Sequence, residues 1–185
     1  MKTAREMYQY CEDNKLGTGM GQKWGTKHFT LIEKALMADE YVAVCFMGLH
    51  NYVSNTKHDN NFAYAITNKR VIMAQQRTFG TAVQFVSLEH VNDITFYTGP
   101  VFGVLTIDTI KEKFNVAVGK PIAANIHQRV QEHLANIVWK HQQQNAVMAM
   151  SPADELRKFK GLLDDGVITE AEYANKKQQL LEYGA

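Results

Sequence analysis

The segment "GLLDDGVITEAEY" near the C-terminus carries carboxylates and a glycine in an order that resembles half of a calcium loop. An EF-hand loop has glycine at its sixth position, a bidentate glutamate at its twelfth, and oxygen ligands at its first, third and fifth. With Gly166 at the sixth position, Glu172 falls at the twelfth and Asp165 at the fifth, but the first and third are Gly161 and Leu163. Because these two side chains offer no oxygen, the segment does not predict a calcium site.

The same residues fit the boundary between two short helices. Gly166 can adopt the left-handed conformation that ends a helix. Thr169 and Glu172 have the spacing of a capping box, which opens the next helix. We therefore predict that Glu172 accepts a hydrogen bond from the backbone and binds no metal.

No other pattern predicts catalysis or a cofactor. The seven histidines form no i, i+4 pair on a helix and no H-E-x-x-H, and the chain has no G-x-S-x-G. The glycines from Gly17 to Gly25 miss the G-x-G-x-x-G spacing because Gln22 stands where the last glycine is needed. We expect a chain that is not an enzyme and that needs neither a metal nor a cofactor.

Three cations are the candidates for an anion-binding or lipid-binding site. Lys57 lies in the polar segment "HNYVSNTKHDNN", and Lys69 and Arg70 lie in the next turn. Phosphorylated headgroups are bound by several charge-assisted hydrogen bonds at once. Three cations over two loops are few for this, so a solvated rim is the alternative, with weak contact to a membrane surface as the most that they predict.

The composition is that of a globular protein with one domain and a small appendage. The 185 residues are 45% hydrophobic and 21% charged, and the net charge of +1 gives no reason to expect a nucleic-acid partner. The longest apolar run, residues 42–49, is too short to span a membrane, and the first residues lack the apolar core of a signal peptide. We therefore expect a cytoplasmic protein in which Cys11 and Cys45 are reduced thiols, with Cys45 buried.

The hydrophobic periodicity changes along the chain. Apolar residues recur at helical spacing in 3–14, where Thr3 and Glu6 form a possible capping box, and again in 27–38. From 41 to 118 the period is two, with turn signals that separate about seven short strands. A helix then begins at Pro121 and reaches Gln143, with Trp139 opposite its apolar stripe.

Two parts of the sequence resemble known families. "AYAITNKRVIMAQQ", "FGTAVQFVSLEHVNDITFYTGPVFGVLTI" and "KFNVAVGKPIAANIHQRV" resemble a bacterial pleckstrin-homology (PH)-like domain of the YokE type. The tail "ADELRKFKGLLDDGVITEAEYANKKQQLL" is similar to the SHOCT motif, a short C-terminal helical hairpin. The resemblance implies an α+β fold: a PH-like seven-stranded antiparallel barrel or sandwich capped by a helix, with a helical N-terminal segment and a two-helix hairpin. The expected boundaries are 1–38 for that segment, 39–143 for the PH-like domain, 144–150 for a linker and 151–183 for the hairpin.

The hairpin carries an apolar face that it cannot bury by itself. A pair of helices of about thirty residues is too small to form a stable core alone. The face must therefore pack on the PH-like body, on a second copy or on another protein, and Trp139 is a candidate dock. The predicted interaction surface consists of Trp139, Leu156, Phe159, Leu163, Ile168, Tyr173 and Leu180.

These observations predict a non-enzymatic interaction module. It self-associates or binds a protein partner through the C-terminal hairpin. A peripheral protein that binds phospholipid headgroups is the alternative.

Overall fold

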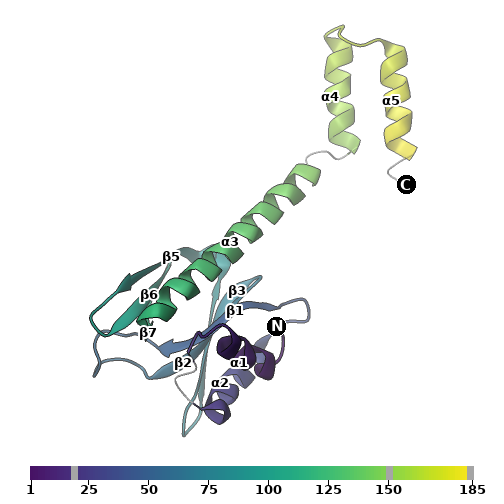
Figure 1. The fold of residues 1–185 in the computed structure, drawn as a ribbon. Helices are drawn as coiled ribbons and strands as arrows, with labels where there is room; N and C mark the ends of the chain where they lie inside the picture. The colour runs from purple at the N-terminus through teal and green to yellow at the C-terminus, as the bar shows by residue number, and fades with distance from the viewer. Residues whose placement is uncertain (18–20, 149–151, 183–185) are drawn as a thin grey trace. The chain divides into compact units, whose positions relative to one another are not determined.

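The computed structural model describes residues 1–17, 21–148 and 152–182, with side chains described for 1–17, 21–137 and 153–180. The chain divides into two compact units, Met1–Ala135 and Asn136–Ala185, which are considered separately. The first unit holds two N-terminal helices, a sheet and the start of a long helix (Figure 1). The helices are α1 (Ala4–Asp13), α2 (Gln22–Ala35), α3 (Lys120–Met148), α4 (Pro152–Asp164) and α5 (Glu170–Glu182). The strands are β1 (Val42–Leu49), β2 (Asn61–Thr67), β3 (Arg70–Gln76), β4 (Thr81–Ser87), β5 (Val91–Thr98), β6 (Phe102–Thr109) and β7 (Lys113–Gly119), with a 3₁₀ turn at Leu88–His90.

The seven strands form one antiparallel sheet in the order β4-β3-β2-β1-β7-β6-β5. Strands that follow one another in sequence pair along two runs, β1 to β4 and β5 to β7. The runs meet where β1 pairs with β7 through Leu49 and Ala117. The seven predicted strands and the α+β class, consistent with a PH-like fold, are confirmed.

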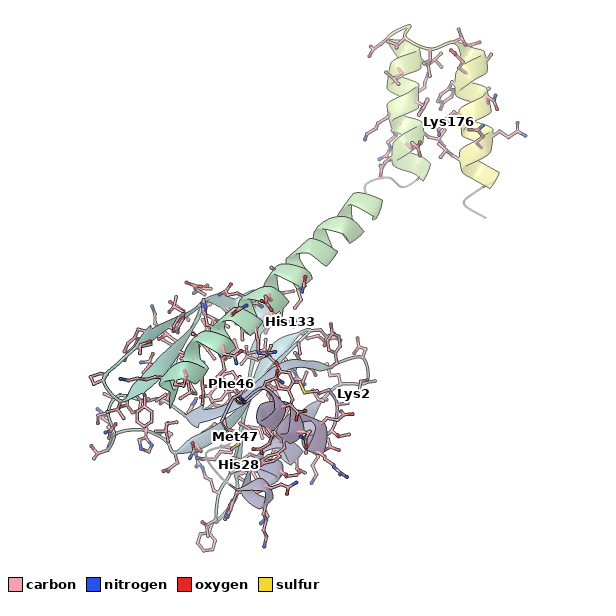
Figure 2. All side chains as sticks on the ribbon, viewed as in Figure 1. Lys2, His28, Phe46, Met47, His133 and Lys176 are labelled. Atoms are coloured by element: carbon pink, nitrogen blue, oxygen red, sulfur yellow. The ribbon has the colours of Figure 1, made fainter. Side chains whose placement is uncertain are left out.

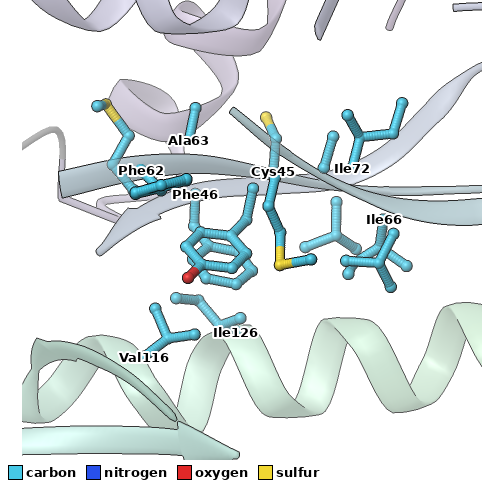
Figure 3. Packing of buried hydrophobic residues seen from close by; sticks show 14 of the residues in the cluster. Cys45, Phe46, Phe62, Ala63, Ile66, Ile72, Val116 and Ile126 are labelled. Carbon is cyan, nitrogen blue, oxygen red and sulfur yellow. The ribbon is translucent and has the colours of Figure 1, made fainter. Parts of the chain in front are cut away.

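The central strands are buried on both faces. Five consecutive residues of β1, Val44 to Gly48, are buried, and so are five of β3, Val71 to Gln75. Cys45 and Ile72 lie on the side of the N-terminal helices, whereas Phe46 and Ile66 lie on the side of α3 (Figure 3). Strands covered on both faces have continuous apolar sequences, because neither side of the pleat meets water.

The helices α1 and α2 form the cover on one face of β1 to β3. Thr3 caps α1 by accepting a hydrogen bond from the Glu6 N–H, and the Glu6 carboxylate accepts one from the Thr3 N–H, which confirms the predicted capping box. Helix α2 begins at Gln22, five residues before the predicted start. The reason is tertiary, because the ring of Tyr8 packs on Gly25, where a Cβ would lie 2.7 Å from a ring carbon.

The helix α3 covers the other face. Ile126 and Val130 are buried in the core, as their place in the apolar stripe predicts. Gly103 of β6 lets the helix approach closely, because a Cβ there would lie 2.4 Å from the Cβ of Ala123. Helix α3 runs to Met148, beyond its predicted end at Gln143, so residues 144–148 of the predicted linker are helical. This stretch contains no glycine or proline that would stop a helix.

A buried histidine pairs with a buried tyrosine in the core of the first unit. His50 Nδ1 and the Tyr64 hydroxyl are 2.5 Å apart, and His50 also stacks on Phe62 with ring centroids 4.2 Å apart. A neutral imidazole has one N–H and a phenol has one O–H, and a single hydrogen bond joins these two side chains. The other ring nitrogen, His50 Nε2, has no hydrogen-bond partner among the described residues. Burial lowers the pKa of His50, and the nearby Asp59 opposes this only in part.

Gly103→Ala should destabilise the first unit by about 1–3 kcal/mol, because the new methyl group pushes α3 away from β6. Denaturant unfolding measures this change. Gly161→Ala in α4 is the control, since a Cβ there meets nothing within 4 Å. Equal stability of Gly103→Ala and the parent chain would show that α3 does not pack this closely on the strand.

The lowered pKa of His50 predicts that acid destabilises the fold. The folded state favours the neutral form of His50. The free energy of unfolding is therefore unaffected by His50 above the unfolded pKa of about 6.5. Below that pH it falls, by at most about 1.4 kcal/mol per pH unit. Denaturant unfolding between pH 7.5 and 5 should show a smaller fall for His50→Phe. Replacing the exposed His90 by Asn should leave the fall unchanged.

Candidate interaction surfaces

The three predicted anion-binding cations do not converge. Lys57 lies in the loop before β2, and Lys69 and Arg70 follow its other end. A seven-residue strand separates the two positions by roughly 20 Å, at about 3.3 Å per residue. The sequence shows that the cations are on neighbouring loops, but only the strand direction shows that the loops are at opposite ends.

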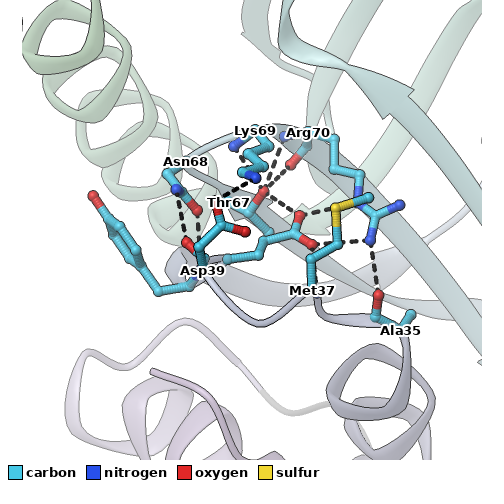
Figure 4. Close-up of polar contacts among 9 residues, drawn as sticks. Ala35, Met37, Asp39, Thr67, Asn68, Lys69 and Arg70 are labelled. Atoms are coloured by element: carbon cyan, nitrogen blue, oxygen red, sulfur yellow. Dashed lines mark hydrogen bonds and ion pairs between the residues drawn. The ribbon is translucent and has the colours of Figure 1, made fainter.

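Arg70 is committed to a buried ion pair. Its Nε and one terminal nitrogen donate to the two carboxylate oxygens of Glu40, each at 2.9 Å, and that terminal nitrogen also donates to the Ala35 carbonyl (Figure 4). The Thr67 hydroxyl adds a third hydrogen bond to the carboxylate at 2.8 Å. The Glu40 side chain is 0% exposed and that of Arg70 is 16% exposed. Arg70 therefore joins the end of α2 to the β2–β3 turn.

Charge compensation keeps Glu40 ionised despite its burial. Burial by itself would raise the pKa of Glu40. Hydrogen bonds from Arg70, the Met37 backbone and Thr67 outweigh that effect, so the pKa is lowered. A buried carboxylate with this set of donors serves the structure and is not available to a ligand.

Lys69 also forms an ion pair, but this pair is exposed to solvent. Its Nζ lies 2.6 Å from a carboxylate oxygen of Asp39, which is 73% exposed. The neighbouring Asn68 ties the same turn to the segment before β1, because its side chain accepts a hydrogen bond from the Tyr41 N–H (Figure 4). Both cations of this turn thus hold it to residues 35–41. Sequence reasoning missed this role because the acids lie about 30 positions away.

Two surface depressions flank the loop of residues 50–60. One, of about 680 Å³, is lined by polar side chains such as Gln75 and Arg77 together with the aromatic Trp24 and Phe79. The other, of about 480 Å³, is lined mainly by apolar residues around Tyr52 and Tyr97. Lys57 lines neither of these two. Among the residues that the structure describes, no three His, Cys, Asp or Glu side chains gather as a metal site would require.

The second unit contains the helical hairpin of α4 and α5. Gly166 has φ +71° and ends the first helix, as predicted. The Glu172 carboxylate accepts hydrogen bonds from the Thr169 N–H and hydroxyl, each at 2.8 Å. The Glu172 N–H donates to the Thr169 hydroxyl in return. The predicted capping box is therefore confirmed.

A seam of apolar residues joins the two helices. Its members are the six predicted hairpin residues, all half-buried: Leu156, Phe159, Leu163, Ile168, Tyr173 and Leu180. Lys176 belongs to the same seam, with its Nζ 5.4 Å from the Phe159 ring centre and 3.1 Å from a Glu155 carboxylate oxygen (Figure 2). Its position between Tyr173 and Leu180 on one helix face was the available signal. The side chain of Trp139, the remaining predicted surface residue, lies outside the described residues.

The seam is not closed to water. No side chain described between 153 and 180 is fully buried, and the large apolar residues Leu162 and Val167 are 38% and 68% exposed. By contrast, the first unit has more than thirty buried apolar or polar residues in and around its core, Phe46 and Tyr64 among them. The described part of the hairpin thus has a half-buried apolar seam but no buried core.

Two family models match the chain. Residues 36–164 match the family described as Bacterial PH domain. The chain belongs to the bacterial PH domain family. Residues 154–181 of this PH-domain protein match the Short C-terminal domain, SHOCT. No curated protein matched the chain. The narrower YokE type stays a prediction.

No described helix is long and apolar enough to cross a membrane.

Arg70→Met should destabilise the PH domain by about 3–5 kcal/mol, because it leaves the Glu40 carboxylate buried without its partner. Lys69→Met removes an exposed ion pair and should cost less than about 1 kcal/mol. Denaturant unfolding of both variants measures the difference. Adding Glu40→Gln to Arg70→Met should recover part of the loss, and a double variant as unstable as the single one would contradict this explanation.

Proposed function

We propose that this PH-domain protein is a non-enzymatic interaction module that associates through its SHOCT hairpin. The hairpin either binds a second copy of the chain or docks on a protein partner. The observation that carries the proposal is the half-buried seam of Leu156, Phe159, Leu163, Ile168, Tyr173 and Leu180.

The energetic argument rests on size. Two helices of 13 residues each have a high cost of ordering, and helices this short are marginal in water without tertiary packing. The seam removes only part of its apolar surface from water, and burial of the rest would add about 25 cal/mol per Å². A partner surface that covers the seam would therefore stabilise the hairpin and the complex together.

The polar groups of the hairpin favour a specific partner orientation. Lys176 and Glu155 form an ion pair with side chains 31% and 25% exposed, next to the Phe159 ring. A partner that covers the seam must leave this pair its hydrogen bonds or replace them, because an unpaired charge at an interface is costly. The pair thus acts against indiscriminate hydrophobic contacts.

The phospholipid alternative has weaker support. Lys69 and Arg70 already pair with Asp39 and Glu40, and Lys57 is at the other end of β2. A site for a phosphorylated headgroup needs cations that are free and close together. Salt-sensitive binding to anionic vesicles, lost in Lys57→Glu, would favour this alternative over the protein-interaction proposal.

Truncation after Met148 should lower the mass of the particle in solution. This cut falls at the end of α3 and removes the hairpin while it leaves the first unit whole. Light scattering coupled to size exclusion measures the mass of residues 1–185 and 1–148. If the full chain is assembled and the truncated chain is equally assembled, self-association through the hairpin is wrong and a separate protein partner is favoured.

A charge placed in the seam should weaken association by at least tenfold. Phe159→Glu inserts a carboxylate among half-buried apolar side chains, which disfavours any complex that buries them. The control is Lys158→Glu on the neighbouring exposed position, which changes the charge more but lies outside the seam. Sedimentation of both variants over a concentration series tests this, and circular dichroism verifies that both keep their helices. Equal weakening by the two variants would contradict a role of the seam.

A further inference from the structure

The two cysteines of the chain lie against each other in the first unit. Cys11 on α1 and Cys45 on β1 are 34 positions apart in sequence, yet their Sγ atoms are 3.9 Å apart. No other cysteine is present in the sequence. Both side chains are 0% exposed, at the contact between α1 and the face of the sheet that α1 covers.

The two thiols link the helix and the strand in both directions. Cys11 Sγ donates to the Cys45 carbonyl at 3.4 Å, and Cys45 Sγ donates to the Met7 carbonyl at 3.3 Å. The sulfur atoms of a disulfide are about 2.0 Å apart. To form a disulfide, the two sulfurs must therefore come about 2 Å closer. This requires that both side chains rotate away from these carbonyls and that α1 shifts slightly.

The structure assigns Cys11 and Cys45 as an oxidative modification site, at which a disulfide bond fastens the N-terminal helix α1 to strand β1. The co-reactant is a disulfide of low molecular mass, such as oxidised glutathione. One thiol attacks it to form a mixed disulfide and releases one small thiol, and the second cysteine then displaces the other. In sum, two protein thiols and one small disulfide give one protein disulfide and two small thiols, so the protein loses two hydrogen atoms.

The reaction is gated by the detachment of α1. Neither sulfur can be reached while the helix is in place. Burial and the neighbouring Cys11 also raise the pKa of Cys45, which disfavours the reactive thiolate in the closed state. The helix has only ten residues and lies on the outside of the sheet, and short elements of this kind can open locally before the rest of a fold. When α1 lifts, both thiols are exposed together, because both lie at the contact between α1 and β1.

The bond would hold α1 on β1 for as long as it stays oxidised. It closes a loop from Cys11 to Cys45 that contains the glycine-rich segment and the whole of α2. A loop of this length reduces the freedom of the unfolded chain enough to raise the melting temperature by on the order of 10 °C. This inference concerns the first unit and does not depend on the role of the hairpin.

The direct test treats the full chain with oxidised glutathione at pH 8 and measures the intact mass without reductant. The expected product lacks two hydrogen atoms, yields one linked peptide that contains both cysteines, melts about 10 °C higher, and returns to the starting state with reductant. Cys11→Ser and Cys45→Ser are the controls, and neither should show the shift. Stable glutathione adducts, linked dimers or unreacted thiols as the main product would overturn the assignment.

A second variant tests the gate without touching either sulfur. Thr3→Ala removes the cap of α1, which should open the helix roughly fivefold more often and speed the oxidation by the same factor. Thr26→Ala, at a half-buried position of α2 away from that cap, is the matched control and should leave the rate unchanged. An unchanged rate in Thr3→Ala would overturn the proposed gating by α1.

Discussion

The structure depends on one constraint, which is that strands β1, β2 and β3 have no polar face. Their side chains alternate between two layers, and both layers are apolar, so both must be kept from water. The β5–β7 strands and α3 provide one cover. The helices α1 and α2 provide the other, and for this reason they belong to the same compact unit as the sheet.

Polar contacts of the first unit attach the covering helices α1 and α2 to the sheet. Arg70 and Glu40 hold the end of α2 against the β2–β3 turn, at the point where the chain passes from the helical layer into β1. The thiols of Cys11 and Cys45 hold α1 to β1 within the layer itself. This ion pair and the one between Lys69 and Asp39 explain why the cations at 69 and 70 make a poor anion site, because both neutralise acids of this chain.

The hairpin differs from the first unit, because its apolar seam has too few residues to form a core that excludes water. Its sequence spends many positions on helix boundaries, such as Gly166 and the Thr169–Glu172 capping box, which define the shape of the hairpin. Its half-buried seam leaves surface for a partner. A well-defined local shape with an incomplete core is what the proposed association through the hairpin requires.

The sequence by itself determined the features that depend on neighbours in the chain. The two-residue period gave seven strands, the capping boxes at Thr3 and Thr169 gave helix starts, and the seam residues of the hairpin followed from helical spacing. The tertiary structure decided what depends on distant partners: the pairing of Arg70 with Glu40, the separation of Lys57 from Lys69 by the length of β2, the early start of α2 at the Gly25–Tyr8 contact, and the meeting of Cys11 with Cys45. The physical reason is that capping and periodicity act over three or four residues, whereas these contacts join positions 17 to 34 apart, and only the packing of the helices and the sheet brings such positions together.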